Sequence, residues 1–173
     1  MNLIITCARH LEPETEEELR GIIEEFGDSD VKISITNMSG ILTADTNLDP
    51  VLVVRKMKEM LLDEPWSIRY CLRIIPIQHV TETKIEEIEN IVTKCTNQIL
   101  DDETYRISIE KRNSNLCSQE IITKIADKIK NKVSLEFPNK IILIEILGDK
   151  TGISIVKKSD ILSIEKTKRS LSE

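Results

Sequence analysis

Apolar and polar positions in the first half of the chain predict a compact domain of mixed strands and helices. Short apolar runs that suit strands alternate with two stretches in which apolar residues recur every three or four positions, the spacing of a buried helix face. The predicted elements are strands at residues 2–8, 31–36, 40–45 and 66–80 and helices that begin at Pro13 and Pro50. Their order, β-α-β-β-α-β, is that of the ferredoxin-like split motif.

The second half restarts with a helix and ends in a hairpin. An amphipathic stripe of apolar residues runs from Ile85 to Ile99. The other predicted elements are strands at residues 105–109, 140–147 and 153–156 and a helix at residues 118–132 with Ser118 as its N-cap. This pattern predicts an α+β protein with domains at residues 1–78 and 79–162, followed by a basic C-terminal tail at residues 163–173 whose last residues we expect to be mobile.

Charge is distributed unevenly along the chain. The formal net charge is −6, yet residues 1–65 carry 6 Lys/Arg and 14 Asp/Glu, whereas the chain from Thr104 onward carries 14 Lys/Arg and 9 Asp/Glu. An acidic N-terminal half joined to a basic C-terminal half suggests contact with nucleic acid at one end only. Chance unevenness of surface charge remains an alternative explanation of these counts.

Membrane proteins and secreted proteins are disfavoured by the sequence. No run of eighteen apolar residues exists, and the N-terminus lacks the basic segment of a signal peptide. The four cysteines are widely spaced without a C-x-x-C pair, which is typical of reduced thiols in a cytoplasmic protein.

Catalytic signatures are also missing. The two histidines, His10 and His79, lie in different halves, and no Cys/His spacing resembles a zinc site. The five glycines form neither a phosphate-binding loop nor a dinucleotide fingerprint. We therefore expect a protein that is not an enzyme and that holds no cofactor and no metal ion.

A cluster of basic and small polar residues is the strongest candidate for function. The strand at residues 105–109 ends in Lys-Arg-Asn-Ser-Asn at residues 111–115, and the predicted helix that follows carries Lys124, Lys128 and Lys132 at intervals of four. Ammonium groups along a helix edge can follow a phosphate backbone, and the guanidinium of Arg112 suits bidentate phosphate contact. We expect Arg112 and Lys124 to be exposed. The lysines could alternatively snorkel, with their aliphatic stems covering the core edge.

Four stretches in order resemble a known family. These are WSIRYCLRIIPI at 66–77, YRISIEKRNSN at 105–115, KIILIEILGD at 140–149 and TGISIVKKSDIL at 151–162. Together they resemble the THUMP domain preceded by its N-terminal ferredoxin-like domain. The resemblance is greatest to the stand-alone THUMP proteins that act as adaptors in tRNA cytidine acetylation.

This resemblance implies a fold, a function and a set of site residues. The fold would be a ferredoxin-like β-α-β-β-α-β domain followed by an α/β THUMP domain. The function would be a tRNA-binding adaptor that presents tRNA to an RNA cytidine acetyltransferase for N4-acetylcytidine formation, so the partners would be tRNA and that acetyltransferase. The RNA-binding positions would fall on Arg106, Lys111, Arg112, Asn113, Ser114, Lys124, Lys128, Lys157 and Lys158.

Two other functions remain open on the sequence. The chain could be the RNA-binding portion of a THUMP-containing tRNA methyltransferase, thiouridine synthase or pseudouridine synthase that lacks its catalytic domain. It could also be a protein-interaction module on a ferredoxin-like scaffold. Only the interaction module would show no salt-dependent affinity for RNA.

Overall fold

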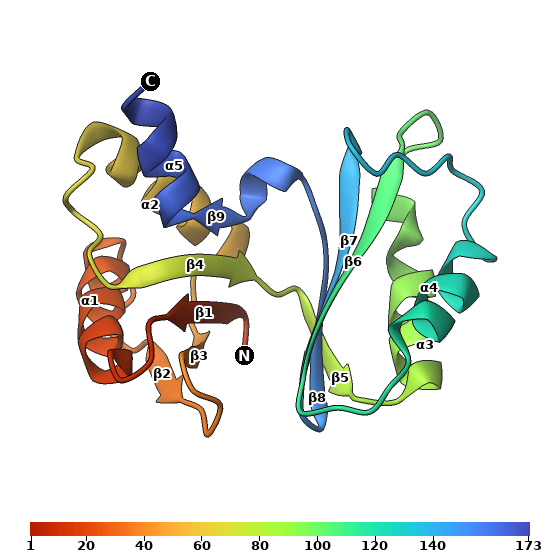
Figure 1. The fold of residues 1–173 in the computed structure, drawn as a ribbon, viewed down its shortest axis with the longest axis horizontal. Coiled ribbons are helices and arrows are strands. Elements are labelled where there is room, and N and C mark those ends of the chain that lie inside the picture. The colour runs from red at the N-terminus through yellow and green to blue at the C-terminus, as the bar shows by residue number, and fades with distance from the viewer. The chain divides into compact units, whose positions relative to one another are not determined.

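The chain folds into two compact units that each contain one β-sheet (Figure 1). The structure is a computed structural model that describes residues 1–173. The first unit consists of residues 1–77 and 159–173, and the second unit of residues 78–158. The mixture of helices and two sheets confirms the predicted α+β class.

The first unit has the ferredoxin-like element order that the sequence predicts. Its five-stranded sheet is antiparallel throughout and has the order β2-β3-β1-β4-β9. Its elements are β1 (Leu3–Cys7), α1 (Glu12–Glu25), β2 (Lys32–Ile35), β3 (Ile41–Asp45), α2 (Pro50–Asp63), β4 (Cys71–Pro76), β9 (Leu162–Ser163) and α5 (Ile164–Leu171). The three helices contribute to one core cluster, to which Leu19 of α1, Val54 of α2 and Ile164 of α5 belong.

The predicted strand at residues 66–80 is wrong in length, because two different sheets use its residues. At its start, the Glu18 carboxylate accepts hydrogen bonds from the backbone N–H groups of Arg69 at 2.7 Å and Cys71 at 3.0 Å. These bonds hold the chain before β4 in a turn. At its end, Ile77 N donates to Asn2 O in the first unit, but Gln78 N donates to Ile153 O in the second. The segment therefore divides into β4 and β5 (His79–Glu82).

The second unit places two helices on one face of a four-stranded sheet. Its elements are β5, α3 (Ile85–Cys95), a 3-10 turn (Thr96–Gln98), β6 (Tyr105–Arg112), α4 (Ser118–Ala126), β7 (Lys140–Leu147) and β8 (Lys150–Val156). The strand order is β5-β8-β7-β6, with β6 parallel to β7 and the other pairs antiparallel. Apolar side chains of α3 and α4 share one core with Ile142, Ile144 and Ile146 of β7.

The predicted helix at residues 118–132 is too long. Helix α4 ends at Ala126, a turn follows at residues 127–128, and residues 132–134 then lie beside the start of β6. Tyr105 N donates to Lys132 O at 3.1 Å, and Ser134 N donates to Tyr105 O at 2.9 Å. The N-cap is Cys117 rather than Ser118, and no side chain caps the helix. These hydrogen bonds to β6 override the helical pattern of the sequence, so Lys128 and Lys132 do not continue a helical row with Lys124.

Residues 163–173, expected to form a separate C-terminal tail, belong to the first unit and contain helix α5. Leu162 pairs with Ile74 in the first sheet, and Leu162 and Ile164 are both buried. Lys168 Nζ then donates to Ile68 O at 3.0 Å. The buried Leu162 and Ile164 explain this difference, because an exposed tail would leave them in water.

Two further expectations concern the membrane and the cysteines. None of the helices has the length and apolar character needed to cross a membrane. All four cysteines are unbridged, and Cys7, Cys71 and Cys95 are buried, whereas Cys117 is exposed. Three of the four therefore act as small apolar residues of the core.

Candidate nucleic-acid interface

The site residues predicted from sequence lie at two opposite ends of β6. Arg106 lies near its N-terminal end, whereas Lys111 and Arg112 form its C-terminal end. A strand rises by about 3.3 Å per residue, so the two ends are separated by about 23 Å. The cations that the sequence predicts as one cluster are therefore divided into two groups.

Lys157 and Lys158 join the N-terminal group, because of the direction of β8. This strand is antiparallel to β7, and Val156 lies opposite Ile141, which in turn lies beside Arg106. The two lysines follow Val156 and are exposed. Sequence alone places them just over fifty residues from Arg106, but the sheet brings them to the same end.

At the C-terminal end, neighbouring cations point to opposite faces of the sheet, as alternate strand residues must. Lys111 lies on the helix-covered face, where its Nζ donates to Leu116 O at 2.8 Å. Arg112 lies on the other face, where its Nη1 is 2.9 Å from Glu145 Oε2. The side chain of Glu145 is 0% exposed and that of Arg112 is 23% exposed.

This arrangement corrects the expectation that Arg112 is exposed. A buried carboxylate needs a nearby cation and hydrogen-bond donors to remain in a low-dielectric interior. Arg112 supplies both to Glu145. Its first role in the structure is therefore to compensate a buried charge.

The polar residues after β6 form a tight turn. Asn113 adopts φ 54°, a left-handed conformation that asparagine tolerates better than most residues. Ser114 Oγ accepts a hydrogen bond from Leu116 N at 3.2 Å. Ser114 therefore stabilises the approach to α4, and the exposed side chain of Asn113 is left to face solvent.

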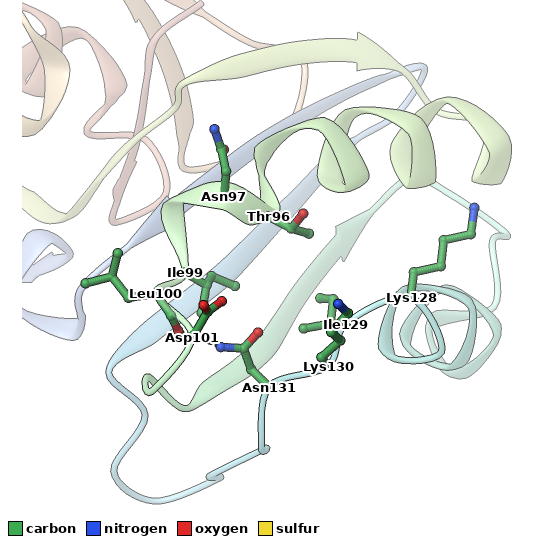
Figure 2. Close-up of a pocket in the computed structure, with 9 residues that line it drawn as sticks. All are labelled: Thr96, Asn97, Ile99, Leu100, Asp101, Lys128, Ile129, Lys130 and Asn131. Atoms are coloured by element: carbon green, nitrogen blue, oxygen red, sulfur yellow. Dashed lines mark hydrogen bonds between the residues drawn. The ribbon is translucent and has the colours of Figure 1, made fainter.

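A pocket of about 690 Å³ lies in the second unit, between the end of α3 and the segment that follows α4 (Figure 2). The side chains around it combine amides, cations and an apolar floor. They are Thr96, Asn97, Ile99, Leu100, Asp101, Lys128, Ile129, Lys130 and Asn131. A cavity of this volume has the size of known small-ligand pockets, which span about 300–1,000 Å³.

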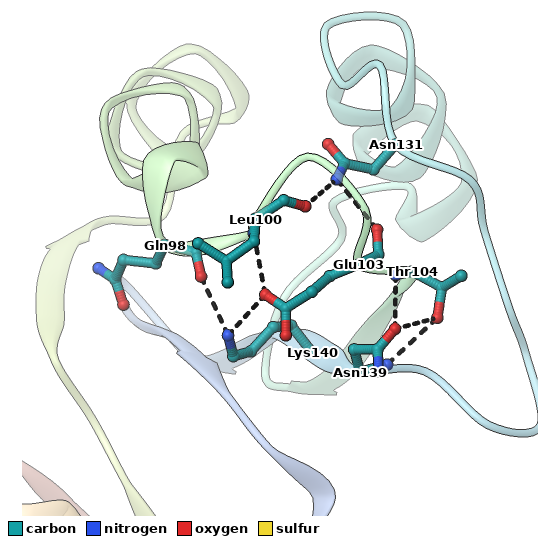
Figure 3. Close-up of polar contacts among 7 residues, drawn as sticks. All are labelled: Gln98, Leu100, Glu103, Thr104, Asn131, Asn139 and Lys140. Atoms are coloured by element: carbon teal, nitrogen blue, oxygen red, sulfur yellow. Dashed lines mark hydrogen bonds and ion pairs between the residues drawn. The ribbon is translucent and has the colours of Figure 1, made fainter.

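Hydrogen bonds fix the walls of this pocket (Figure 3). Asn131 Nδ2 donates to Leu100 O at 2.7 Å and to Glu103 O at 3.0 Å. Lys140 Nζ donates to Gln98 O at 3.1 Å and to Glu103 Oε1 at 2.8 Å. The hydrogen bond from Lys140, together with one from Leu100 N, holds the pKa of Glu103 below its ordinary value of 4.5. These contacts join residues 98–103 to the segment after α4 and to β7.

The lysines around the pocket differ in how they are compensated. Lys128 Nζ is 2.6 Å from Glu89 Oε1, and this hydrogen bond holds the pKa of Glu89 below 4.5. Lys124 is 3.9 Å from Glu120 and 41% exposed. Lys130 and Lys132 form no ion pair within 4.0 Å. Lys130 and Lys132 are thus the more available cations for an anionic ligand.

The charge of the second unit is balanced overall but uneven along its chain. Residues 78–158 carry 13 Lys/Arg and 13 Asp/Glu, whereas residues 104–158 alone carry 11 and 6. The three cations of the predicted tail, Lys166, Lys168 and Arg169, belong to α5 of the first unit. The positive excess of the second unit therefore comes from residues 104–158, and the compensating acids lie in residues 78–103, three of them on α3.

Sequence reasoning missed Lys130, Asn131 and Phe137. Lys130 and Asn131 line the pocket beyond the end of α4, and the prediction of a helix over residues 118–132 hid this position. Phe137 is 83% exposed, and nothing in its local sequence distinguishes it from a core phenylalanine.

No group of three or more His, Cys, Asp or Glu side chains lies close enough together to hold a metal ion. The one contact between a cysteine and a histidine is that of Cys95 Sγ with His79 Nε2, at 3.2 Å. Burial raises the pKa of the Cys95 thiol, which disfavours the thiolate that nucleophilic chemistry requires.

Comparison with known proteins identifies the second unit. Residues 82–156 match the THUMP domain, which confirms that part of the family resemblance. A THUMP domain indicates RNA binding in the context of tRNA modification. The match spans the last residue of β5, all of β8 and all elements between them.

Relatives of known sequence or structure are longer than this chain. An uncharacterized protein of Methanocaldococcus jannaschii is 28% identical over 127 residues, which cover 70% of this chain and 35% of that protein. PH1313 from Pyrococcus horikoshii shares the fold with a TM-score of 0.61 at 19% identity, over 91% of this chain and 55% of that one. The chain therefore spans between about a third and just over half of these relatives.

Two further solved structures share the same fold. TrmN from Thermus thermophilus has a TM-score of 0.59 at 11% identity, over 90% of this chain and 45% of that one. A 4-thiouridine synthetase, solved as an RNA complex with bound ATP, has a TM-score of 0.52 at 15% identity, over 91% of this chain and 42% of that one. In both, as in PH1313, the likeness covers the two units together.

Proposed function

We propose that the chain is a tRNA-binding adaptor that presents tRNA to an RNA cytidine acetyltransferase for N4-acetylcytidine formation, and that it is not itself an enzyme. The observation that carries this proposal is the THUMP domain at residues 82–156. The sequence resemblance to stand-alone THUMP adaptors supports the acetylation role. In this role the chain binds the RNA, and its partner supplies the chemistry.

RNA contact is assigned to the N-terminal end of β6. Lys130, Lys132 and Lys158 are exposed there, and Arg106 is partly exposed. Ammonium and guanidinium groups contact phosphates and give affinity that weakens with salt. The pocket beside them has an apolar floor of Ile99 and amide groups on its walls, a combination that can hold an unpaired base while the lysines hold its phosphates.

The C-terminal end of β6 contributes less in this proposal. Arg112 and Lys111 are already engaged, with Glu145 and Leu116 respectively. An RNA phosphate there would compete with these contacts. Asn113 remains as an exposed polar group that can reach a sugar or a phosphate.

Reconstitution tests the adaptor role. RNA cytidine acetyltransferase from the same organism is incubated with tRNA, acetyl-CoA and ATP, with and without this chain. Nucleoside mass spectrometry should show more N4-acetylcytidine when the chain is present. It should show none when the chain is incubated without the acetyltransferase. An equal yield with and without the chain would contradict the proposal.

A second candidate is the RNA-binding portion of a larger tRNA-modifying enzyme. The length of the relatives favours it, because the chain spans 35% of the M. jannaschii protein and 42% of the 4-thiouridine synthetase. Nucleosides of tRNA from cells that lack the protein distinguish the two candidates. Loss of N4-acetylcytidine supports the adaptor, whereas loss of a methylated nucleoside, a thiouridine or a pseudouridine supports the second candidate.

A further inference from the structure

β6 is the longest strand at the edge of either sheet. It has eight residues, whereas the other edge strands, β2, β5 and β9, have four, four and two. Short edge strands are a common way to prevent pairing with other chains. β6 lacks that protection and contains no proline or bulge.

Only the first residue of this edge is covered. The segment after α4 exchanges hydrogen bonds with the N–H and C=O of Tyr105. Backbone groups alternate between the two sides of a strand, and Arg112 O faces β7, where it accepts from Gly148 N. The outward N–H and C=O groups beyond Tyr105 therefore belong to Ile107, Ile109 and Lys111, and no hydrogen bond within the chain covers them.

We propose that two copies of this chain associate through β6, antiparallel, with the two-fold axis at Ser108. Residues 106–110 read Arg-Ile-Ser-Ile-Glu, which is the same in both directions except for the opposite charges at its ends. In this register Arg106 faces the partner's Glu110, and Ile107 faces the partner's Ile109. A two-fold interface needs a surface that is complementary to itself, and this sequence provides one.

The hydrogen-bonding pattern fits the same register. Ile107 and Ile109 both present their N–H and C=O outward, so each forms a hydrogen-bonded pair with the other in the opposite copy. Ser108 then faces the partner's Ser108 as a non-hydrogen-bonded pair, in which the side chains approach most closely. If the register between the two copies shifted by one residue, the outward N–H and C=O groups of one β6 would face residues whose groups point inward, and these hydrogen bonds would be lost.

The charges at the two ends are available for this pairing. Glu110 is exposed and forms no ion pair in the chain. It lies opposite Glu145 of β7, whose carboxylate Arg112 already compensates, so Glu110 is the carboxylate that a cation from a second copy would meet. Arg106 uses one Nη1 hydrogen bond for Leu135 O at 2.9 Å, which leaves its other N–H groups for a carboxylate.

Apolar side chains flank the uncovered edge. Val133, Leu135 and Phe137 are 55%, 71% and 83% exposed, on the segment that bonds to Tyr105. Antiparallel pairing brings the end of the partner's β6 to this segment. Burial of these side chains would add the apolar contact that five residue pairs alone do not supply.

Sedimentation of the purified chain over a concentration series tests the proposal. We expect the mass to rise from 19.8 kDa toward twice that value as concentration increases. Arg106→Glu and Glu110→Arg should each return the protein to the monomer, because each sets like charges opposite one another. The double variant Arg106→Glu/Glu110→Arg should restore the dimer. Unchanged association in both single variants, or a monomer at every concentration, would overturn the proposal.

Cross-linking at the axis tests the register without disturbing the charges. In a Cys117→Ser background, which removes the exposed cysteine, Ser108→Cys should form an intermolecular disulfide under a mild oxidant. Gln119→Cys on α4 should not. Absence of the Ser108 cross-link in a protein that circular dichroism shows to be folded would overturn self-pairing. The proposal would also be overturned if the protein stayed monomeric and the Ile107 and Ile109 amides were protected from hydrogen exchange only when another protein or RNA was bound.

Discussion

Arg112 of β6 reaches Glu145 on β7, with its Nη1 2.9 Å from a carboxylate oxygen that belongs to a fully buried side chain. The sequence places Arg112 in a polar turn and suggests a surface cation. The strand register shows why it is not one. Arg112 lies beside Leu147 of β7, and Leu147 is two positions beyond Glu145. The side chains of Arg112 and Glu145 therefore lie on the same face of the sheet.

Loss of Arg112 should therefore affect stability more than RNA binding. Arg112→Gln leaves the carboxylate of Glu145 buried without its cation, and breaking a buried pair in this way costs roughly 3–5 kcal/mol. Urea unfolding of the variant measures this cost. The double variant Arg112→Gln/Glu145→Gln should recover part of it, because two neutral amides need no countercharge. A single variant as stable as the wild type would contradict the assignment.

The C-terminal helix should be required for the first unit to fold stably. Ile164 is 3% exposed within the core of that unit, and truncation of such a residue costs about 2–5 kcal/mol. We expect Ile164→Ala to lower the free energy of unfolding by this amount. Leu171→Ala, at a position that is 44% exposed, is the matched control and should change it by no more than about 0.5 kcal/mol. Equal effects of the two substitutions would show that α5 is not packed as described.

Charge and packing can be separated at Lys124 of α4. Lys124→Met keeps the aliphatic stem and removes the ammonium group. If Lys124 contacts a phosphate, tRNA affinity falls nearly equally for all tRNA sequences, and the slope of log K against log salt decreases by roughly 0.7–0.9 in magnitude. If the side chain only covers the core edge, affinity and slope stay unchanged. Filter binding across a potassium chloride series decides between these outcomes.

Acid should weaken the first unit through Asp28. Hydrogen bonds from Thr46 Oγ1 and from the backbone N–H of Asn47 hold the pKa of Asp28 below its ordinary value of 3.8. A carboxyl whose pKa is lowered by folding contributes stability above its unfolded value and loses it as the pH falls through the folded value. We therefore expect unfolding free energy to decline below about pH 3.8.

Asp28→Asn tests this pH dependence. The variant should be less stable than the wild type at neutral pH and should lose less stability between pH 4 and pH 2, as followed by thermal unfolding. Asp102→Asn, at an exposed loop position, is the control and should leave the profile unchanged. If Asp28→Asn lost as much stability between pH 4 and pH 2 as the wild type, another group would be responsible for the acid sensitivity.

Element order could be read from the sequence because it depends on local periodicity. The helices that begin near Pro13 and Pro50 have the apolar spacing of one buried helix face, and the strand at residues 140–147 is an apolar run that is buried on both faces except for its first residue. Boundaries that depend on distant partners could not be read. The strand at residues 66–80 is divided because Ile77 bonds to Asn2 and Gln78 bonds to Ile153, and neither partner is visible from local spacing.

The candidate site was less predictable than the fold. Sequence distance placed Lys111, Arg112 and Lys128 together, but the direction of β6 separates them, and the antiparallel β8 brings Lys157 and Lys158 to Arg106 instead. Side-chain partners were also hidden. Glu145 lies 33 positions from Arg112 in an apolar strand, so no spacing rule links them.

In the proposed function, the second unit binds tRNA through the cations at the N-terminal end of β6. The most direct measurement is the affinity of the whole chain for total tRNA across a salt series, for the wild type and for Lys130→Gln. Lys130 is exposed and forms no ion pair, so its loss should not disturb the fold. Lys58→Gln on α2 of the first unit serves as the control. We expect salt-dependent binding whose log–log slope falls in magnitude by roughly 0.7–0.9 in Lys130→Gln and is unchanged in the control. Binding that is absent, insensitive to salt, or weakened equally by Lys58→Gln would contradict this proposal.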